Sequence, residues 1–127
     1  MDINKEKLAK EIGQRVHDER LDLELSEARL SDYLEVPESY IREIESGETM
    51  PSTEHLFQMC CIFGKTLDYM VKGVVPEEGN ADAAYYKEQQ FKFLISHMSP
   101  EHQEYIKGRL KYYYDLEYAE NGKTKQK

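Results

Sequence analysis

The sequence predicts an all-α fold, and three observations support this. Apolar residues recur three and four positions apart along nearly the whole chain, as they do on the buried face of a helix. Residues that start helices (Ser, Thr and Pro) and residues that stop them (Gly) stand at the ends of these stretches. No segment shows the clear alternation of a strand. In 127 residues we expect one compact domain followed by a two-helix hairpin.

Five short helices are predicted in residues 1–73, at about 5–20, 27–34, 38–46, 53–63 and 67–72. Capping hydroxyls stand before three of them, at Ser26, Ser52 and Thr66. Pro37 pre-sets its own φ for the start of the third, and Gly47 follows the end of that helix. The apolar stripes predict a core built from Leu8, Ile12, Val16, Leu30, Tyr33, Leu34, Ile41, Ile44, Leu56, Met59, Cys60, Phe63, Leu67, Met70 and Val71.

The C-terminal third is predicted to form a helical hairpin after a linker. Residues 74–82 are rich in Pro, Gly and acids, which is typical of a linker. In residues 83–127, one apolar stripe runs from Phe91 to Met98, and Ser99-Pro100 restarts a helix that continues to about Ala119. The last residues are expected to be a frayed tail. The predicted organisation is therefore 1–73, 74–82 and 83–127.

The charge of the chain is acidic and unevenly distributed. The net charge is −8, of which residues 1–73 contribute −7, with nine Lys/Arg against sixteen Asp/Glu. Proteins that bind DNA usually carry a basic surface, because neutralising the phosphates supplies most of the affinity. Any basic patch on this chain must therefore be built from few residues.

Several classes of function find no support in the sequence. There is no Gly-rich phosphate loop, nucleophile elbow or paired acid set, so we expect no enzyme and no cofactor. The four histidines show no metal-ligand spacing, and adjacent Cys60 and Cys61 favour ordinary packing over a redox role. No apolar run approaches the roughly 18 residues that span a bilayer. The N-terminus has no apolar signal-peptide core, so we expect a cytoplasmic protein.

An ordered set of landmarks spans about residues 12–73. The landmarks are Ile12-Gly13-Gln14-Arg15, Leu25-Ser26, Leu30, Tyr33-Leu34, Val36, Tyr40-Ile41, Ile44-Glu45-Ser46-Gly47, Pro51-Ser52, Leu56, Phe63-Gly64 and Leu67-Asp68-Tyr69. Together they resemble the lambda-repressor/Cro-like helix-turn-helix family, often called XRE. The resemblance implies a five-helix domain whose third helix lies in the DNA major groove, while the second crosses the phosphates.

The resemblance also implies which residues would face DNA. By alignment, the family's contact positions fall on Ser26 and Glu27 at the start of the second helix, and on Glu38, Ser39, Tyr40, Arg42 and Glu43 of the third. Arg15 and Arg29 are further candidates for phosphate contacts, against the alternative that they form surface ion pairs.

This sequence departs from the family at several of these positions. The family commonly has glutamine where Glu27 stands, glycine where Glu35 stands, and a capping Ser or Thr in place of Pro37. It usually has polar or basic residues in place of Glu38 and Glu43. A carboxylate can accept a hydrogen bond from a cytosine amine, but it repels the flanking phosphates. The same acids could equally form a solvated helix face, where Glu38 also suits the helix dipole.

Seven of the ten tyrosines lie in the predicted hairpin. Tyr112, Tyr113 and Tyr114 are consecutive and cannot all face one core, and Tyr105 precedes them by about two turns. Amphipathic tyrosines suit protein interfaces. We therefore expect these four residues to mediate self-association or partner binding; packing on the first domain and stacking on single-stranded nucleic acid are the alternatives.

Two functional hypotheses follow. The first is a transcriptional regulator that binds a double-stranded operator through residues 38–46, as a homodimer assembled by residues 83–119. The second is a helix-turn-helix module turned to protein recognition, such as an antagonist of another regulator, with an acidic surface that mimics DNA or meets a basic partner. Convergence of Arg15, Arg29 and Arg42 on one face would favour the first hypothesis, and a uniformly negative face the second.

Overall fold

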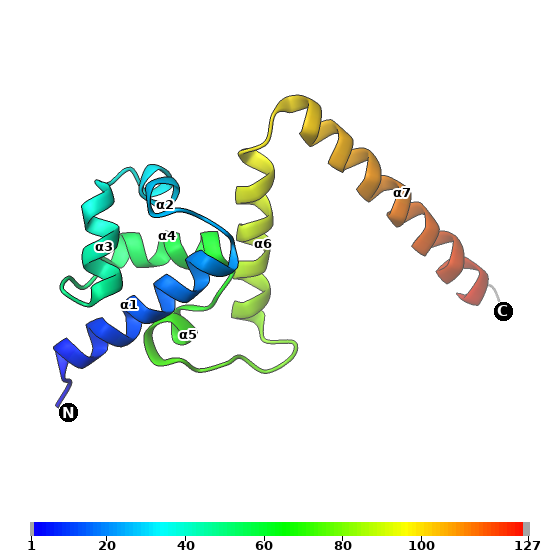
Figure 1. The fold of residues 1–127 in the computed structure, drawn as a ribbon. Coiled ribbons are helices and arrows are strands. Elements are labelled where there is room, and N and C mark those ends of the chain that lie inside the picture. Colours follow the sequence, from blue (N-terminus) through cyan, green and yellow to red (C-terminus); the bar gives the residue numbers. More distant parts are fainter. Residues whose placement is uncertain (1, 126–127) are drawn as a thin grey trace. The chain divides into compact units, whose positions relative to one another are not determined.

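The computed structural model describes residues 2–125, with side chains for residues 2–121, and it confirms the all-α prediction (Figure 1). The described part of the chain contains seven helices: α1 (Lys5–Asp22), α2 (Glu27–Leu34), α3 (Glu38–Ser46), α4 (Thr53–Phe63), α5 (Leu67–Lys72), α6 (Ala81–Ser96) and α7 (Pro100–Lys125). The chain divides into two compact units, of which the first ends at Phe93 and the second begins at Leu94.

Local capping positions the short helices where the sequence predicts them. The hydroxyls of Ser26, Ser52 and Thr66 accept hydrogen bonds from the backbone N–H three residues on, at 3.0–3.1 Å. Asn4, which the sequence did not single out as a cap, caps α1 in the same way. Gly47 adopts a left-handed conformation (φ 84°) directly after α3, which ends the helix there.

The turn between α2 and α3 keeps its left-handed geometry without glycine. Glu35 adopts φ 57° and ψ 45° at the C-terminal cap of α2, and its N–H bonds to the carbonyl oxygens of Asp32 and Ser31. For a residue with a Cβ, this region of φ/ψ space is less favourable by roughly 1–2 kcal/mol. The turn that the family usually builds with glycine is therefore formed here at a local energetic cost.

The core of the first unit lies among α1–α5 and matches most of the predicted stripes. Ile12, Val16, Leu30, Ile41, Ile44, Met59, Cys60 and Met70 are all at most 2% exposed. Leu67 differs from the prediction, since it is 40% exposed. Helices α1 and α3 approach closely, because Gly13 leaves room for the backbone of α3: a Cβ there would lie 2.1 Å from the Ile44 carbonyl oxygen.

The first three turns of α6 belong to the first unit and pack on its core. Tyr86 is 9% exposed and belongs to the core cluster, and the Gln90 side-chain amide donates to the Ile62 carbonyl oxygen at 3.0 Å. Phe93 meets the ring of Tyr33 edge-on. The non-helical segment before α6 resembles the predicted linker, but the boundary between compact units falls inside α6 rather than at residues 74–82. Pairing of α6 with α7 as a hairpin stays a prediction.

Helix α7 dominates the second unit and is longer than the sequence suggested. The Ser99 hydroxyl caps it as predicted, accepting from the His102 N–H at 3.2 Å. Asn121-Gly122 were expected to lie in a frayed tail, yet α7 continues to Lys125. A single glycine costs a helix only about 1 kcal/mol, which its neighbours can offset. Residues 126–127 of the predicted tail lie outside the described part.

Candidate nucleic-acid interface

Helix α3 presents one buried and one exposed face. Ile41 and Ile44 are fully buried, which orients the helix on the core. Its exposed face carries four of the predicted contact residues, Glu38, Ser39, Arg42 and Glu43. The α2 N-terminus precedes it in the chain with Ser26 as its cap, so the local geometry is that of two short helices joined by a tight turn.

A buried ion pair holds α3 against α1. The Arg20 guanidinium donates to both carboxylate oxygens of Glu45, at 2.7 and 3.0 Å, and to the Leu25 carbonyl oxygen at 2.8 Å. The side chains of both partners are less than one-tenth exposed. His17 Nδ1 lies 2.6 Å from the same carboxylate. Glu45 is one of the landmarks of the resemblance, whereas Arg20 was not singled out from the sequence, because nothing local marks an arginine as buried.

Arg42 lies on the exposed face between two carboxylates. Its guanidinium is 3.4 Å from the Glu38 carboxylate and 4.0 Å from that of Glu27. One Glu27 oxygen is buried without a hydrogen bond among the described residues. The positive charge of Arg42 is thus largely balanced by its neighbours, while its side chain remains more than half exposed.

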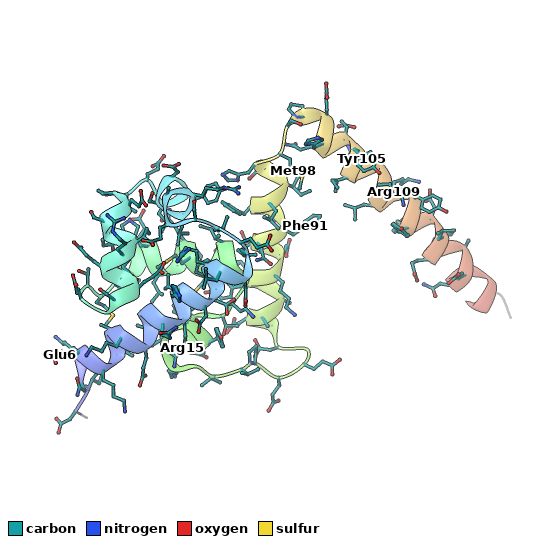
Figure 2. The ribbon with its side chains drawn as sticks, in the orientation of Figure 1. Glu6, Arg15, Phe91, Met98, Tyr105 and Arg109 are labelled. Atoms are coloured by element: carbon teal, nitrogen blue, oxygen red, sulfur yellow. The ribbon has the colours of Figure 1, made fainter. Side chains whose placement is uncertain are left out.

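The other two candidate arginines do not join Arg42. The Arg15 guanidinium donates to the carbonyl oxygens of Met70 and Val71, at 3.1 and 2.9 Å, near the C-terminal end of α5 (Figure 2). Such a cation satisfies carbonyls that the end of a helix leaves free. Arg29 donates to the Tyr33 hydroxyl at 2.7 Å, one turn along α2. No basic cluster therefore forms from the three residues.

Tyr40 and Glu43 both contact the segment that follows α3. The Tyr40 hydroxyl accepts from the Ser52 N–H at 3.2 Å and lies 3.0 Å from His55 Nδ1. The Thr49 hydroxyl lies 3.5 Å from a Glu43 carboxylate oxygen. Tyr40 is half-buried and therefore joins α3 to α4, whereas Glu43 remains exposed.

The candidate partner residues of α7 are exposed. Tyr105, Tyr112, Tyr113 and Tyr114 expose 53–66% of their surface. Arg109 lies 5.4 Å from the ring centroids of both Tyr112 and Tyr113 and donates to the Tyr113 hydroxyl at 3.2 Å. Figure 2 marks Tyr105 and Arg109 on this helix. The helix therefore carries exposed aromatic surface that its own unit does not cover.

Burial raises the pKa of several ionisable groups in the first unit. Burial raises the pKa of the Cys60 thiol to about 12 and also raises that of Cys61. Both cysteines are free. Burial raises the pKa of Glu19 above its ordinary value, opposed by Lys65 and by a hydrogen bond from Tyr69. Within residues 2–125 no cluster of three or more His, Cys, Asp or Glu is arranged to hold a metal ion.

Comparison with known proteins settles the family of the first domain. A family model described as helix-turn-helix matches residues 16–70. These residues form a lambda-repressor-like helix-turn-helix domain. The match covers α2 and α3 with the turn between them, together with α4 and most of α5. No curated protein and no solved structure matches the chain. Among the described helices, none is both long enough and apolar enough to cross a bilayer.

Proposed function

We propose that the protein is a sequence-specific DNA-binding transcription regulator that acts as a homodimer. The observation that carries this proposal is the exposed face of α3 within a lambda-repressor-like helix-turn-helix domain. In such domains the second helix of the motif enters the major groove and reads base edges. A regulator of this kind would act in the cytoplasm, where a bacterial chromosome lies.

The roles of the interface residues follow from their contacts. Arg42 is the best donor for a guanine edge or a phosphate, because it is exposed and only loosely held by Glu38 and Glu27. Ser39 offers a hydroxyl on the same face, and Ser26 brings the N-terminus of α2 toward a phosphate. Arg15 would contribute less, since its guanidinium is occupied by α5.

Homodimer formation would occur through α7. The exposed Tyr105, Tyr112, Tyr113 and Tyr114 provide apolar area with hydroxyls that can remain hydrated, which suits a protein interface. A dimer would present two α3 helices about 34 Å apart, one DNA turn. Analytical ultracentrifugation of the full chain tests this: Tyr113→Ser should weaken the dimer, and a wild-type monomer at 100 µM would contradict it.

The DNA assignment is tested by selecting operators from random duplexes at about 50 mM salt, then titrating salt on the selected sequence. Arg42→Ala should cost about 1–3 kcal/mol of binding and relax specificity at one position. Lys72→Ala is the matched control, because Lys72 also forms an exposed i,i+4 ion pair but lies on α5. A folded protein that selects no duplex would exclude this function.

One observation favours a second candidate function. The exposed cation of α3 is balanced by Glu27 and Glu38, and Glu43 adds a further carboxylate to that face. An acidic face of this kind would attract a basic protein partner and repel phosphates. If this function holds, Glu43→Lys should abolish partner binding in a pull-down from the source cell, and the wild-type protein should retain no DNA.

A further inference from the structure

The first unit contains a cavity that none of the proposed functions uses. Its volume is about 350 Å³, within the range of roughly 300–1,000 Å³ typical of ligand pockets. It lies where the α4–α5 turn, the segment before α6 and the first turns of α6 meet. The residues that define its chemistry are Lys65, Tyr69, Val75, Pro76, Ala83 and Lys87.

One side of the cavity is apolar and incompletely covered. Val75, Pro76 and Ala83 contribute this side, and Val75 is 75% exposed. An apolar side chain left this open would gain from contact with a bound molecule, because its surface would be removed from water. The ligand should therefore carry an apolar body.

The cationic groups of the cavity come from two different elements. The Lys65 ammonium lies 3.8 Å from the Glu19 carboxylate and 5.4 Å from the centre of the Tyr69 ring, so it is held in place. The Tyr69 hydroxyl donates to the same carboxylate at 3.3 Å. Lys87, on α6, forms no ion pair within the described residues. In an acidic chain, an unbalanced ammonium beside an apolar surface favours an anionic ligand.

We propose that this cavity binds a small organic carboxylate with a compact apolar body. The carboxylate would lie between Lys65 and Lys87, and the body would cover Val75, Pro76 and Ala83. A cavity of about 350 Å³ equals the volume of about twelve water molecules at about 30 Å³ each, which leaves room for a ligand of benzoate size. The proposal does not depend on what α3 binds.

Ligand binding should also stabilise the packing of α6. The cavity is formed jointly by α6 and by the turn before α5, so a ligand that contacts both favours the docked helix. Free inorganic phosphate would satisfy the lysines alone and leave Val75 exposed. The apolar side therefore distinguishes a carboxylate with a body from a simple anion.

The test is titration of the full chain with benzoate, followed by backbone amide NMR shifts and by thermal unfolding. Benzamide, of the same shape but uncharged, and inorganic phosphate serve as comparison probes. We expect benzoate to bind at least tenfold more tightly than either, with shifts centred on residues 64–69 and 75–87. Equal binding of benzamide would overturn the role of the lysines, and equal binding of phosphate would overturn that of the apolar body.

Two variants and one control locate the site. Lys87→Met keeps the length of the side chain but removes its charge, and Ala83→Leu fills the cavity; each should weaken benzoate binding about tenfold. Lys92→Met is the matched control, because Lys92 is an exposed cation of the same helix that pairs with Glu88 and does not line the cavity. Unchanged affinity in Lys87→Met, with the fold intact by circular dichroism, would refute the site. Benzoate shifts that lie outside these residues would also refute it.

Discussion

The ion pair between Arg20 and Glu45 should be the most sensitive polar contact in the first unit. Both side chains are less than one-tenth exposed, and two hydrogen bonds of 2.7 and 3.0 Å join them. Replacing Glu45 by Met leaves a buried guanidinium without its carboxylate. Removing one partner of a buried pair costs about 3–5 kcal/mol, because the remaining charge has lost its solvation.

The double variant separates the ion pair from other effects. Arg20→Met combined with Glu45→Met leaves neither charge buried, so its cost should fall short of the sum of the single costs by about 2 kcal/mol. Part of the cost remains, because the Leu25 carbonyl oxygen loses the donor that Arg20 supplies at 2.8 Å. His17 also loses its contact with Glu45.

Urea unfolding followed by circular dichroism at 222 nm measures these costs, and the chain contains no tryptophan that would serve as a fluorescent probe. Arg42→Met is the control, since its pair with Glu38 is about half exposed, and such surface pairs contribute about 0–1 kcal/mol. A cost below about 1 kcal/mol for Glu45→Met would refute the reasoning. Strict additivity of the two single variants would refute it equally.

Five further predictions concern single sites. Gly13→Ala should lower the free energy of unfolding in urea by about 1–3 kcal/mol, because the alanine Cβ would clash with the α3 backbone. Gly108→Ala, in open space on α7, should instead raise the helix content by circular dichroism, since alanine gains up to about 1 kcal/mol; a loss of helix there would contradict this. Glu35→Gly should raise the free energy of unfolding by up to about 1 kcal/mol by relieving its left-handed φ, and a lower stability would contradict that account. The raised pKa of Glu19 means that the folded state binds this proton more tightly than the unfolded state, so stability falls as pH rises above 4.5. In Glu19→Gln this pH dependence of the free energy of unfolding is absent, so the variant should gain stability relative to the wild type as the pH rises above 4.5. Stability profiles of the two proteins that run parallel with pH would contradict this account. With a pKa of about 12, Cys60 should resist iodoacetamide at pH 8 until urea unfolds the protein, as followed by mass spectrometry, and rapid native labelling would contradict its burial.

The candidate interface was only partly predictable. The exposed positions of α3 followed from the 3.6-residue period, because burying Ile41 and Ile44 leaves Arg42 and Glu43 on the opposite face. The hydrogen-bond partners of the candidate arginines could not be predicted from the same period. Arg15 and Arg29 have the same side chain, yet one donates to the carbonyls of α5 and the other to Tyr33.

The sequence by itself determined the order of the helices, their capping residues and most of the first unit's core. These features depend on periodicity and on contacts three or four residues apart, which any stretch of chain carries within itself. Tertiary structure alone decided the Arg20–Glu45 pair, the docking of Tyr86 and the cavity beside Val75. Each joins residues distant in sequence, and their proximity depends on how whole helices pack, which no local pattern encodes.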